Sequence, residues 1–337
     1  MKQSHELHAV TTMTPLRVSF MGGGTDLPAY YRQRGGVVVS TAIRAYIYVS
    51  VKRHSALFGE RYRVSYSETE HQTTRQNIRN DIVRATLEFL EFDEPLHIST
   101  SADLPAMSGL GSSSSFAVGL LHAIHALRGE EVSSSRLAQE ACQVEIELLG
   151  RPIGKQDQYA AAIGGVNAFF FEPDGRVRIE PVSHHLIEGG GLDNLYLVWT
   201  GMQRKAEEIL EQQNRKTPKN LASLDHFRQQ AISLLDDISL GKLSLRRMGD
   251  LLTTGWRLKR GLAQGIDSPE LDAIWDDLLS SGALGGKLLG AGGGGFFLVV
   301  VPPENLEEFL ARQAARYPLR MRVDVFGTRI LSTVRDV

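Results

Sequence analysis

The sequence predicts an α+β fold divided into two domains. Strand and helix patterns are mixed along the chain without the regular alternation that builds a doubly wound parallel sheet. The chain has 337 residues, 42% of them apolar, which is enough to form two packed cores. At 183–194 (SHHLIEGGGLDN) the composition shifts to glycine and polar residues between two strand patterns. We therefore expect an N-terminal domain at 1–188 and a C-terminal domain at 189–337.

The N-terminal domain begins as a β-rich layer and continues with helices. Alternating and β-branched runs predict strands at 15–20, 37–41, 46–52, 96–100 and 165–171. Apolar residues at helical spacing predict helices at 75–91, 115–127 and 134–149, and serines that can cap a helix precede the last one.

The C-terminal domain has more helix than strand. A strand is expected at 195–199, and helices at 205–213, 221–240, 243–260 and 269–281. A strand pair with a helix between them should complete this domain. The two domains therefore differ in composition but share the mixed α+β character.

Charge and cysteine content exclude several classes of protein. The net charge is −2 and the charged residues are scattered, so we expect no affinity for nucleic acid or for an anionic membrane. The only cysteine is Cys142, which excludes an intrachain disulfide and fits a reducing compartment. The first dozen residues are polar, and no apolar run reaches the roughly 18 residues that span a bilayer. A soluble, cytoplasmic protein is expected.

The segment 105–115 (PAMSGLGSSSS) has the composition of an anion-binding loop. Its glycines and serines lead directly into the apolar helical pattern that starts at Phe116. Unpaired N–H groups at a helix N-terminus attract phosphate oxygens, and glycines let the backbone approach them. Serine hydroxyls can add a phosphate contact or a Mg²⁺ ligand. A flexible linker would not need the apolar periodicity that follows.

Two other glycine-rich segments do not match known nucleotide motifs. The segment 282–288 (GALGGKL) lacks the P-loop spacing, and Leu288 stands where Ser or Thr should bind magnesium. The segment 290–295 satisfies G-x-G-x-x-G, but a strand follows it where a dinucleotide site needs a helix. It remains either a loop close to a ligand or a tight structural turn.

A fourth glycine-rich segment, 17–26 (RVSFMGGGTD), suggests a polar site. Arg17 lies inside a predicted strand, where a buried arginine needs a carboxylate partner. Thr25 and Asp26 follow the three glycines. The candidate partner for Arg17 is Asp157 in 154–159 (GKQDQY), although Asp157 alone would also suit a helix N-cap.

Together these segments resemble the three motifs of the GHMP kinases, in order and across almost the whole chain. The segment 17–26 is similar to the first motif, 105–115 to the nucleotide motif P-x-x-x-G-L-G-S-S, and 287–297 (KLLGAGGGGFF) to the C-terminal glycine motif. Within this superfamily, GGGTD and GKQDQYAAAIGGVN are most similar to the bacterial D-glycero-D-manno-heptose 7-phosphate kinases.

The resemblance implies a fold and an activity. The fold would pair an N-terminal domain like domain 2 of ribosomal protein S5 with a ferredoxin-like C-terminal domain, with the ligands between them. The activity would be an ATP- and Mg²⁺-dependent transfer of the γ-phosphate to the anomeric C1 hydroxyl of a small substrate, the heptose 7-phosphate. Such a product is used to make activated heptoses for capsule or lipopolysaccharide.

The resemblance also implies roles for individual residues. Asp157 would be the general base or an orienting carboxylate, and Arg17 would pair with it and face the transferring phosphate. Ser113 would be a magnesium ligand, and Glu145 would complete the magnesium site unless it is a solvated helix carboxylate like Glu147. The expected nucleotide-binding residues are Pro105, Ser108, Gly109, Leu110, Gly111, Ser112, Ser113 and Ser114.

The acceptor site departs from the pattern of the galactokinases. Where those sequences carry Glu-His before Thr-Asp, this chain has Gly23 and Gly24, which opens space for a longer or phosphorylated substituent. Arg204 and Lys205 are candidates to reach a substrate phosphate. The expected substrate-binding residues are Gly23, Gly24, Thr25, Asp26, Gly292, Gly293, Arg204 and Lys205.

Three alternatives are considered. The chain could be a GHMP kinase for galactose, fucose or mannose, or a regulator that binds ATP and sugar without turnover. Retention of Asp157, Arg17, Ser113 and Glu145 favours an enzyme, because a sensor needs no base. A metal-dependent hydrolase lacks a His/Asp cluster at ligand spacing.

Overall fold

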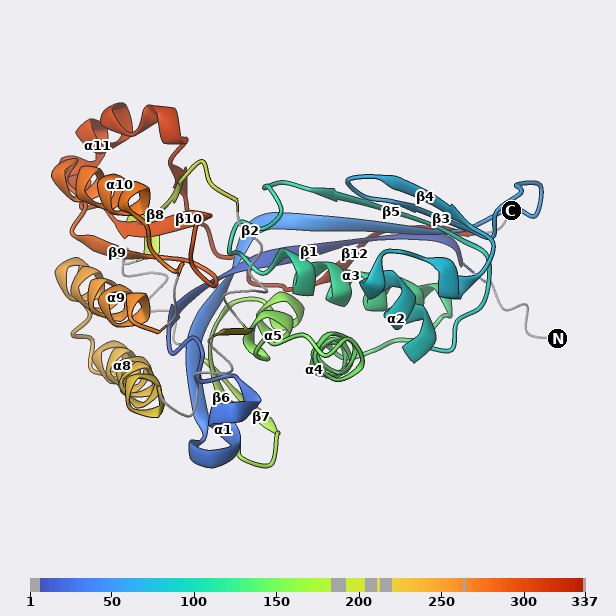
Figure 1. Ribbon diagram of the computed structural model, residues 1–337, viewed down its shortest axis with the longest axis horizontal. Helices are drawn as coiled ribbons and strands as arrows, with labels where there is room; N and C mark the ends of the chain where they lie inside the picture. Colours follow the sequence, from blue (N-terminus) through green and yellow to red (C-terminus); the bar gives the residue numbers. More distant parts are fainter. Residues whose placement is uncertain (1–6, 183–191, 204–210, 213–219, 263–264, 336–337) are drawn as a thin grey trace.

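The computed structural model describes residues 7–182, 192–203, 211–212, 220–262 and 265–335, and within them two sheets with helices packed on each. Figure 1 shows the larger sheet running along the long axis of the molecule, with the smaller sheet and its helices at one end. The mixed helix and strand content confirms the α+β prediction.

The larger sheet has eight strands in the order β12-β1-β2-β5-β3-β4, with β6 and β7 attached through β2. Its strands are β1 (Leu7–Met21), β2 (Gly36–Arg53), β3 (Tyr62–Ser65), β4 (Thr69–Gln72), β5 (Leu96–Ala102), β6 (Val166–Phe171), β7 (Val177–Pro181) and β12 (Arg329–Arg335). The first half of β2 pairs with β6 and its second half with β5. This division lets β2 carry two branches of the sheet.

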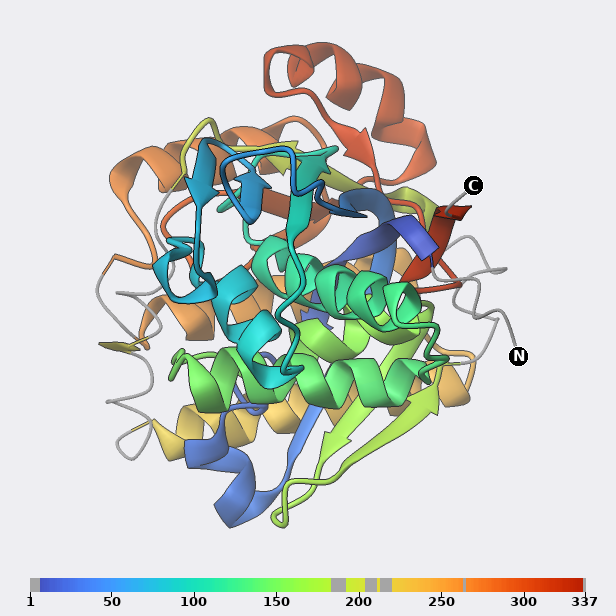
Figure 2. The ribbon, with the colours of Figure 1, turned by 90° about the vertical axis from the view of Figure 1, so that its right-hand side faces the viewer.

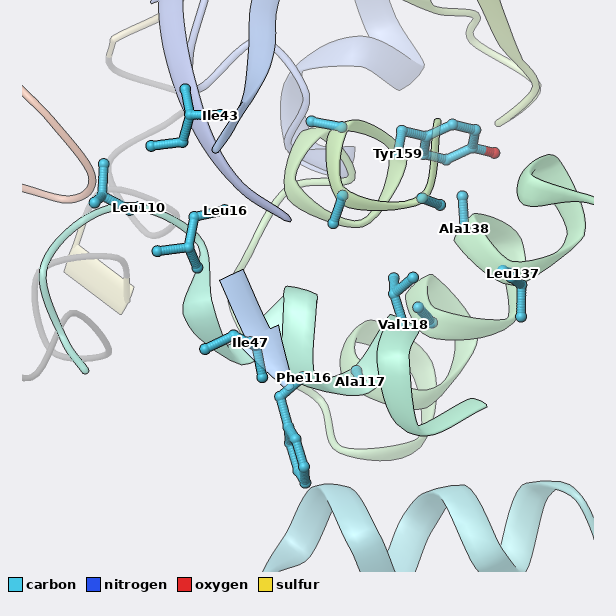
Figure 3. Packing of buried hydrophobic residues seen from close by; sticks show 14 of the residues in the cluster. Leu16, Ile43, Ile47, Leu110, Phe116, Ala117, Val118, Leu137, Ala138 and Tyr159 are labelled. Atoms are coloured by element: carbon cyan, nitrogen blue, oxygen red, sulfur yellow. The ribbon is translucent and has the colours of Figure 1, made fainter. Parts of the chain in front are cut away.

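One face of this sheet is covered by helices (Figures 1 and 2). They are α2 (Asp81–Phe89), α3 (Ser112–Leu127), α4 (Ser134–Cys142), the π-helical turn η2 (Gln143–Leu148) and α5 (Gln156–Ile163). Apolar side chains surround α3 almost completely, so it is buried between the sheet and its neighbours. Figure 3 shows Phe116 and Val118 of α3 in this core, with Leu16 of β1 and Tyr159 of α5. The start of α3 is thereby fixed against β1 and α5.

The smaller sheet has the order β11-β8-β10-β9. Its strands are β8 (Leu195–Trp199), β9 (Gly285–Leu288), β10 (Phe296–Val300) and β11 (Leu319–Arg320), and its helices are α8 (Leu221–Ser239), α9 (Leu245–Arg260), α10 (Pro269–Ser280) and α11 (Leu306–Arg312). A second core forms around Trp256, Trp275 and Phe297. Helices α8 and α9 also contact β1, which joins the two layers.

Several predicted elements differ from the observed ones. The expected strands 37–41 and 46–52 form one strand, β2, because the backbone between them keeps bonds to Gly165 and Arg322. The expected helix 75–91 is interrupted, since the buried Glu70 carboxylate accepts bonds from the N–H groups of Arg79 and Asn80. The remaining elements of this stretch are η1 (Arg75–Asn77) and α2.

The expected division into domains meets one exception. Strand β12, at the end of the chain, pairs with β1 in the larger sheet, although the boundary assigned it to the C-terminal domain. The boundary at 188/189 and most of the expected helix 205–213 lie outside the described residues. A short helix, α1 (Pro28–Arg34), follows the first glycine loop.

Candidate active site

A cavity of about 500 Å³ lies between the larger sheet with its helices and the smaller sheet with its helices. Its wall is formed by the end of β1, the loop Gly22–Gly24, the start of α3, the start of α5, the inner sides of α8 and α9, and the segment from β9 to Ala291. Segments from both domains therefore meet at one site, and all four glycine-rich segments identified in the sequence contribute to it.

Arg17 and Asp157 form a two-pronged ion pair at the cavity. The Nε and Nη2 groups of Arg17 donate to Oδ1 and Oδ2 of Asp157, each at 2.6 Å. The remaining Nη1 donates to the carbonyl of Gly109 at 2.6 Å, which ties the pair to the loop before α3. Because the N-cap of α5 is Lys155, Asp157 lies within the helix and is not its cap. The arginine is buried, and its charge is matched by one carboxylate.

The loop before α3 presents a helix N-terminus to the cavity. Gly109 and Gly111 have φ of +82° and +76°, a conformation that glycine adopts without strain. A Cβ at Gly109 would also lie 2.8 Å from the carbonyl oxygen of Leu289. The unpaired N–H groups of the first helical turn are suited to phosphate oxygens.

The expected nucleotide-binding residues divide into two groups. The cavity is lined by Gly109, Gly111, Ser112, Ser113 and Ser114. Ser108 and Leu110 are fully buried beneath the loop, and Pro105 is exposed outside the cavity. Alternate residues of the loop face the protein, so Ser108 and Leu110 anchor it and do not line the cavity.

Ser113 and Glu145 meet at the edge of the cavity. Ser113 Oγ donates to Glu145 Oε1 at 2.5 Å, and Gln158 Nε2 donates to the other carboxylate oxygen at 2.7 Å. The π-helical turn η2 directs Glu145 inward, where it is fully buried, while neighbouring Glu147 is exposed. The solvated-carboxylate alternative therefore does not describe Glu145. A buried oxygen pair of this kind is the donor chemistry that Mg²⁺ prefers.

A guanidinium group occupies this corner as well. Arg151 Nη1 donates to Ser113 Oγ at 2.5 Å and to Glu145 Oε1 at 3.1 Å, and Nη2 contacts both oxygens of Asp81 at 3.0 Å. Within the described ranges no group of three or more His, Cys, Asp or Glu residues is placed to hold a metal. A divalent cation at this corner would thus share its coordination with phosphate oxygens and displace the arginine contact.

Asp26 lies on the opposite side of the Arg17–Asp157 pair. It is 2% exposed and accepts bonds from the N–H groups of Gly24 at 2.9 Å and Gln156 at 3.2 Å. Burial, and next the charge of Asp157, raise the pKa of the Asp26 carboxyl above its usual value. A Cβ at Gly154 would lie 1.9 Å from Asp26 Oδ2, so glycine is required there. The carboxylate is held by the backbone at the cavity wall.

Two polar atoms near Asp26 are buried without a partner among the described residues: Ser19 Oγ and Gln156 Oε1. Both residues line the cavity, and buried polar groups are normally paired. A bound hydroxyl-rich ligand would satisfy them. Neither residue is among the expected substrate-binding residues, although Ser19 lies two positions after Arg17, on the same face of the strand.

The remaining expected substrate-binding residues are placed differently. Thr25 is fully buried and its Oγ1 donates to the carbonyl of Gly22 at 2.7 Å, so it stabilises the turn beneath the loop. Gly292 and Gly293 pack against Ile266, and the part of this segment that lines the cavity is Gly290 and Ala291. Thr25, Gly292 and Gly293 therefore do not line the cavity, contrary to the expected substrate contacts.

Arg204 and Lys205 lie outside the described residues. Of the expected acceptor residues, Gly23, Gly24 and Asp26 line the cavity.

Two lysines outside the expected site residues also line the cavity. Lys287 Nζ donates to the carbonyls of Ser19 and Phe20, each at 3.1 Å, and Lys259 Nζ donates to the carbonyl of Gly290. Desolvation, and next the charge of Arg17, lower the pKa of Lys287 to about 8. Desolvation and the charges of Lys287 and Arg17 lower the pKa of Lys259 well below its usual value.

Known proteins match this chain in sequence over both halves. Residues 80–165 match the model of the GHMP kinases N-terminal domain, and residues 238–318 match that of the C-terminal domain. The D-glycero-alpha-D-manno-heptose 7-phosphate kinase of Campylobacter jejuni is 31% identical over 298 residues, covering 85% of this chain and 87% of the relative. The galactokinase of Pyrococcus furiosus is 25% identical over 317 residues, covering 84% of this chain and 86% of the relative.

Solved structures share the fold. A D-glycero-D-manno-heptose 1-phosphate kinase from Bacteriodes thetaiotaomicron superimposes with a TM-score of 0.76 at 22% identity, covering 96% of this chain and 99% of that one. Lactococcus lactis galactokinase, complexed with galactose, gives 0.73 at 17% identity, covering 96% and 94%. Fold, cavity and relatives together define an ATP-dependent sugar kinase. The chain belongs to the GHMP kinases.

One further feature concerns membranes. Among the described residues, none of the helices combines the length and the apolar character needed to cross a bilayer.

Proposed function

We propose that this kinase transfers the γ-phosphate of ATP to the anomeric C1 hydroxyl of D-glycero-D-manno-heptose 7-phosphate. The observation that carries the kinase chemistry is the Arg17–Asp157 pair, which lies between the start of α3 and the wall around Asp26. The acceptor is favoured by the name of the Campylobacter jejuni relative and by the loop Gly22–Gly24, which presents no side chains. The product would supply activated heptose for capsule or lipopolysaccharide.

Asp157 would act on the acceptor hydroxyl. Its carboxylate accepts the hydroxyl hydrogen and orients the oxygen, whose lone pair forms a bond to the γ-phosphorus while the bond from that phosphorus to the ADP oxygen breaks. The proton passes to Asp157 or is shared with it as the new bond forms. Because both oxygens of Asp157 are held by Arg17, the carboxylate is oriented before the substrate arrives.

Arg17 and the start of α3 would stabilise the transferring group. The guanidinium is anchored at 2.6 Å to Gly109, at the nucleotide side of the cavity, and brings positive charge to the phosphoryl oxygens. The N–H groups after Gly111 would bind the phosphates of the nucleotide. Asp26, Ser19 and Gln156 would bind the hydroxyls of the sugar.

Ser113 and Glu145 would hold Mg²⁺, which supplies charge neutralisation for the nucleotide phosphates when bound. Both residues offer oxygen donors, and their separation of 2.5 Å places them at one corner of the cavity. Arg151 would release Ser113 and Glu145 and remain paired with Asp81.

A substrate panel tests the proposal. The kcat/KM values for the heptose 7-phosphate, the unphosphorylated heptose, mannose and galactose should be compared by ADP release, and the phosphorylated position identified by NMR. We expect the heptose 7-phosphate to be the best substrate and the product to be the 1,7-bisphosphate. Equal or better efficiency with galactose would reject the heptose acceptor and leave the sugar-kinase assignment alone.

A further inference from the structure

Three cationic side chains converge on one part of the cavity wall. Arg17 comes from β1, Lys259 from the last turn of α9, and Lys287 from β9. Arg17 is neutralised by Asp157. Within the described ranges neither lysine has a carboxylate partner, and the contacts of both Nζ groups are backbone carbonyls. Two ammonium groups thus share a cavity with a single ion pair.

The position of Lys287 assigns this charge to the acceptor side. Its Nζ donates to the carbonyls of Ser19 and Phe20 near the end of β1, and Met21 alone separates them from the loop Gly22–Gly24. The nucleotide side has its own donors for phosphate oxygens, which are the N–H groups at the start of α3 and the guanidinium of Arg151 beside Ser113. Lys259 extends this wall from α9, and its partner Gly290 packs against Gly109, so Lys259 lies where the acceptor side meets the loop before α3.

A second helix, α8, also contributes a polar side chain to the cavity wall. Gln230 of α8 lines the cavity beside Gly255, which precedes Lys259 by one helical turn on α9. Its Oε1 is buried and has no hydrogen-bond partner among the described residues. A sugar bound here would therefore meet a cation for its phosphate and an amide oxygen that can accept a hydrogen bond from one of its hydroxyls.

Like charges at a half-buried wall are unfavourable until an anion joins them. Desolvation first, and neighbouring cations second, lower the pKa values of Lys259 and Lys287, because both disfavour the ammonium form. A phosphate dianion would offset both effects by forming charge-assisted hydrogen bonds with both Nζ groups.

We propose that Lys259 and Lys287 form a phosphate-binding pair, and that the phosphate they bind is the one carried by the acceptor sugar. The inference rests on the proposed function, since it explains how a phosphorylated heptose is selected over a neutral sugar. The lysine pair would bind the substrate phosphate, the role expected of Arg204 and Lys205, which lie outside the described residues. The γ-phosphate of ATP offers the same chemistry, so the two sources must be separated by experiment.

The test measures binding with and without each phosphate. Lys259→Met and Lys287→Met remove the charges, and Lys259→Gln removes the charge but keeps a donor for Gly290. Lys242→Met, an exposed lysine between α8 and α9, is the matched control. Calorimetric titrations use heptose 7-phosphate, the unphosphorylated heptose, and a non-hydrolysable ATP analogue with Mg²⁺. Thermal unfolding checks that each variant is folded.

We expect each charge-removing variant at the cavity to bind heptose 7-phosphate about 10- to 100-fold more weakly. Affinity for the unphosphorylated heptose and for the ATP analogue should change less than about twofold, and the control should match the wild type. Loss confined to the ATP analogue, or unchanged binding of heptose 7-phosphate, would overturn the proposal.

Failure of the proposed function gives a different result. A wild-type protein that binds both heptoses equally rejects the phosphorylated acceptor before any variant is measured. A wild-type preference for heptose 7-phosphate that persists in folded Lys259 and Lys287 variants rejects only the lysine pair.

Discussion

The cavity has two halves that are built in different ways. The half proposed to bind the nucleotide, here the nucleotide half, comes mainly from one continuous segment, 109–114, whose glycines and helix start present backbone N–H groups. The half proposed to bind the acceptor, here the acceptor half, is assembled from separate elements far apart in sequence. Its polar residues are Ser19, Asp26, Gln156, Lys259 and Lys287.

The difference explains which half can be identified from the sequence. Binding by backbone requires a glycine pattern and a helix N-terminus, and both are local properties. Binding by side chains from separate elements depends on how those elements pack, which local patterns do not specify. The Arg17–Asp157 pair connects the two halves, because Arg17 also contacts Gly109.

The largest effect is expected at this connection. Asp157→Asn should lower kcat at least about 10²-fold and leave ATP binding near normal, because the carboxylate acts on the acceptor hydroxyl. Steady-state kinetics and a nucleotide titration measure the two quantities separately. A folded variant that keeps more than a tenth of the wild-type kcat would contradict the role of Asp157.

The acceptor half should be damaged separately by Gly154→Ala. The new Cβ would lie 1.9 Å from Asp26 Oδ2, so the carboxylate must leave its bonds with Gly24 and Gln156. We expect KM for the sugar to rise at least about tenfold, with binding of the ATP analogue nearly unchanged. Gly59→Ala is the control, since a Cβ there meets nothing within 4 Å.

If Gly154→Ala weakened binding of the nucleotide and the sugar equally, the two halves would not be separable units. Circular dichroism and thermal unfolding would exclude a general loss of fold as the cause.

A smaller effect is expected in the nucleotide half. Ser113→Ala and Glu145→Ala should raise the Mg²⁺ concentration needed for half-maximal activity several-fold, with Glu145→Ala the more harmful. Each change removes one oxygen donor from the corner of the cavity. Exposed Glu147→Ala should leave the Mg²⁺ titration unchanged. Unchanged titrations in both test variants would remove the magnesium assignment.

The fold was predictable where the sequence signal is local. The strand 195–199 was predicted with the bounds of β8, and the helices 221–240 and 269–281 extend only one residue beyond α8 and α10. The sheet partners of β12 were not predictable, because pairing between the two ends of the chain leaves no local signal. The interruption before α2 depends on the buried Glu70 of β4. Its carboxylate accepts hydrogen bonds from backbone N–H groups that would otherwise bond within a continuous helix.

The candidate site was likewise predictable only where its sequence signal is local. The glycines at 109 and 111 and the Arg17–Asp157 contact followed from motifs, and the structure places them together. Lys259 lies in a basic helix end (Leu-Lys-Arg) that is typical of a solvated C-terminus. Only the packing of α9 against β9 and β1 brings its amine to the cavity.

The smallest effect concerns the acceptor half: the lowered pKa of Lys287 should make the free energy of unfolding of the protein depend on pH. Desolvation, and next the charge of Arg17 from β1, lower that pKa from 10.5 to about 8. Lys259 from α9 is a second cation near the amine, and Asp157 neutralises Arg17. Between these two pH values the unfolded chain binds more protons than the folded one, so the free energy of unfolding should rise with pH.

Relative to Lys287→Met, the wild type should gain stability from pH 8 to pH 10.5, with a slope of at most ~1.4 kcal/mol per pH unit. Below pH 8 the difference should be constant, because the lysine is then protonated in both states. Urea unfolding at pH 7, 8, 9 and 10 measures it. A difference that stays constant or falls above pH 8 would show that the fold does not destabilise the ammonium form. The acceptor half would then carry its cation without loss of stability, unlike a site that requires an anion to complete it.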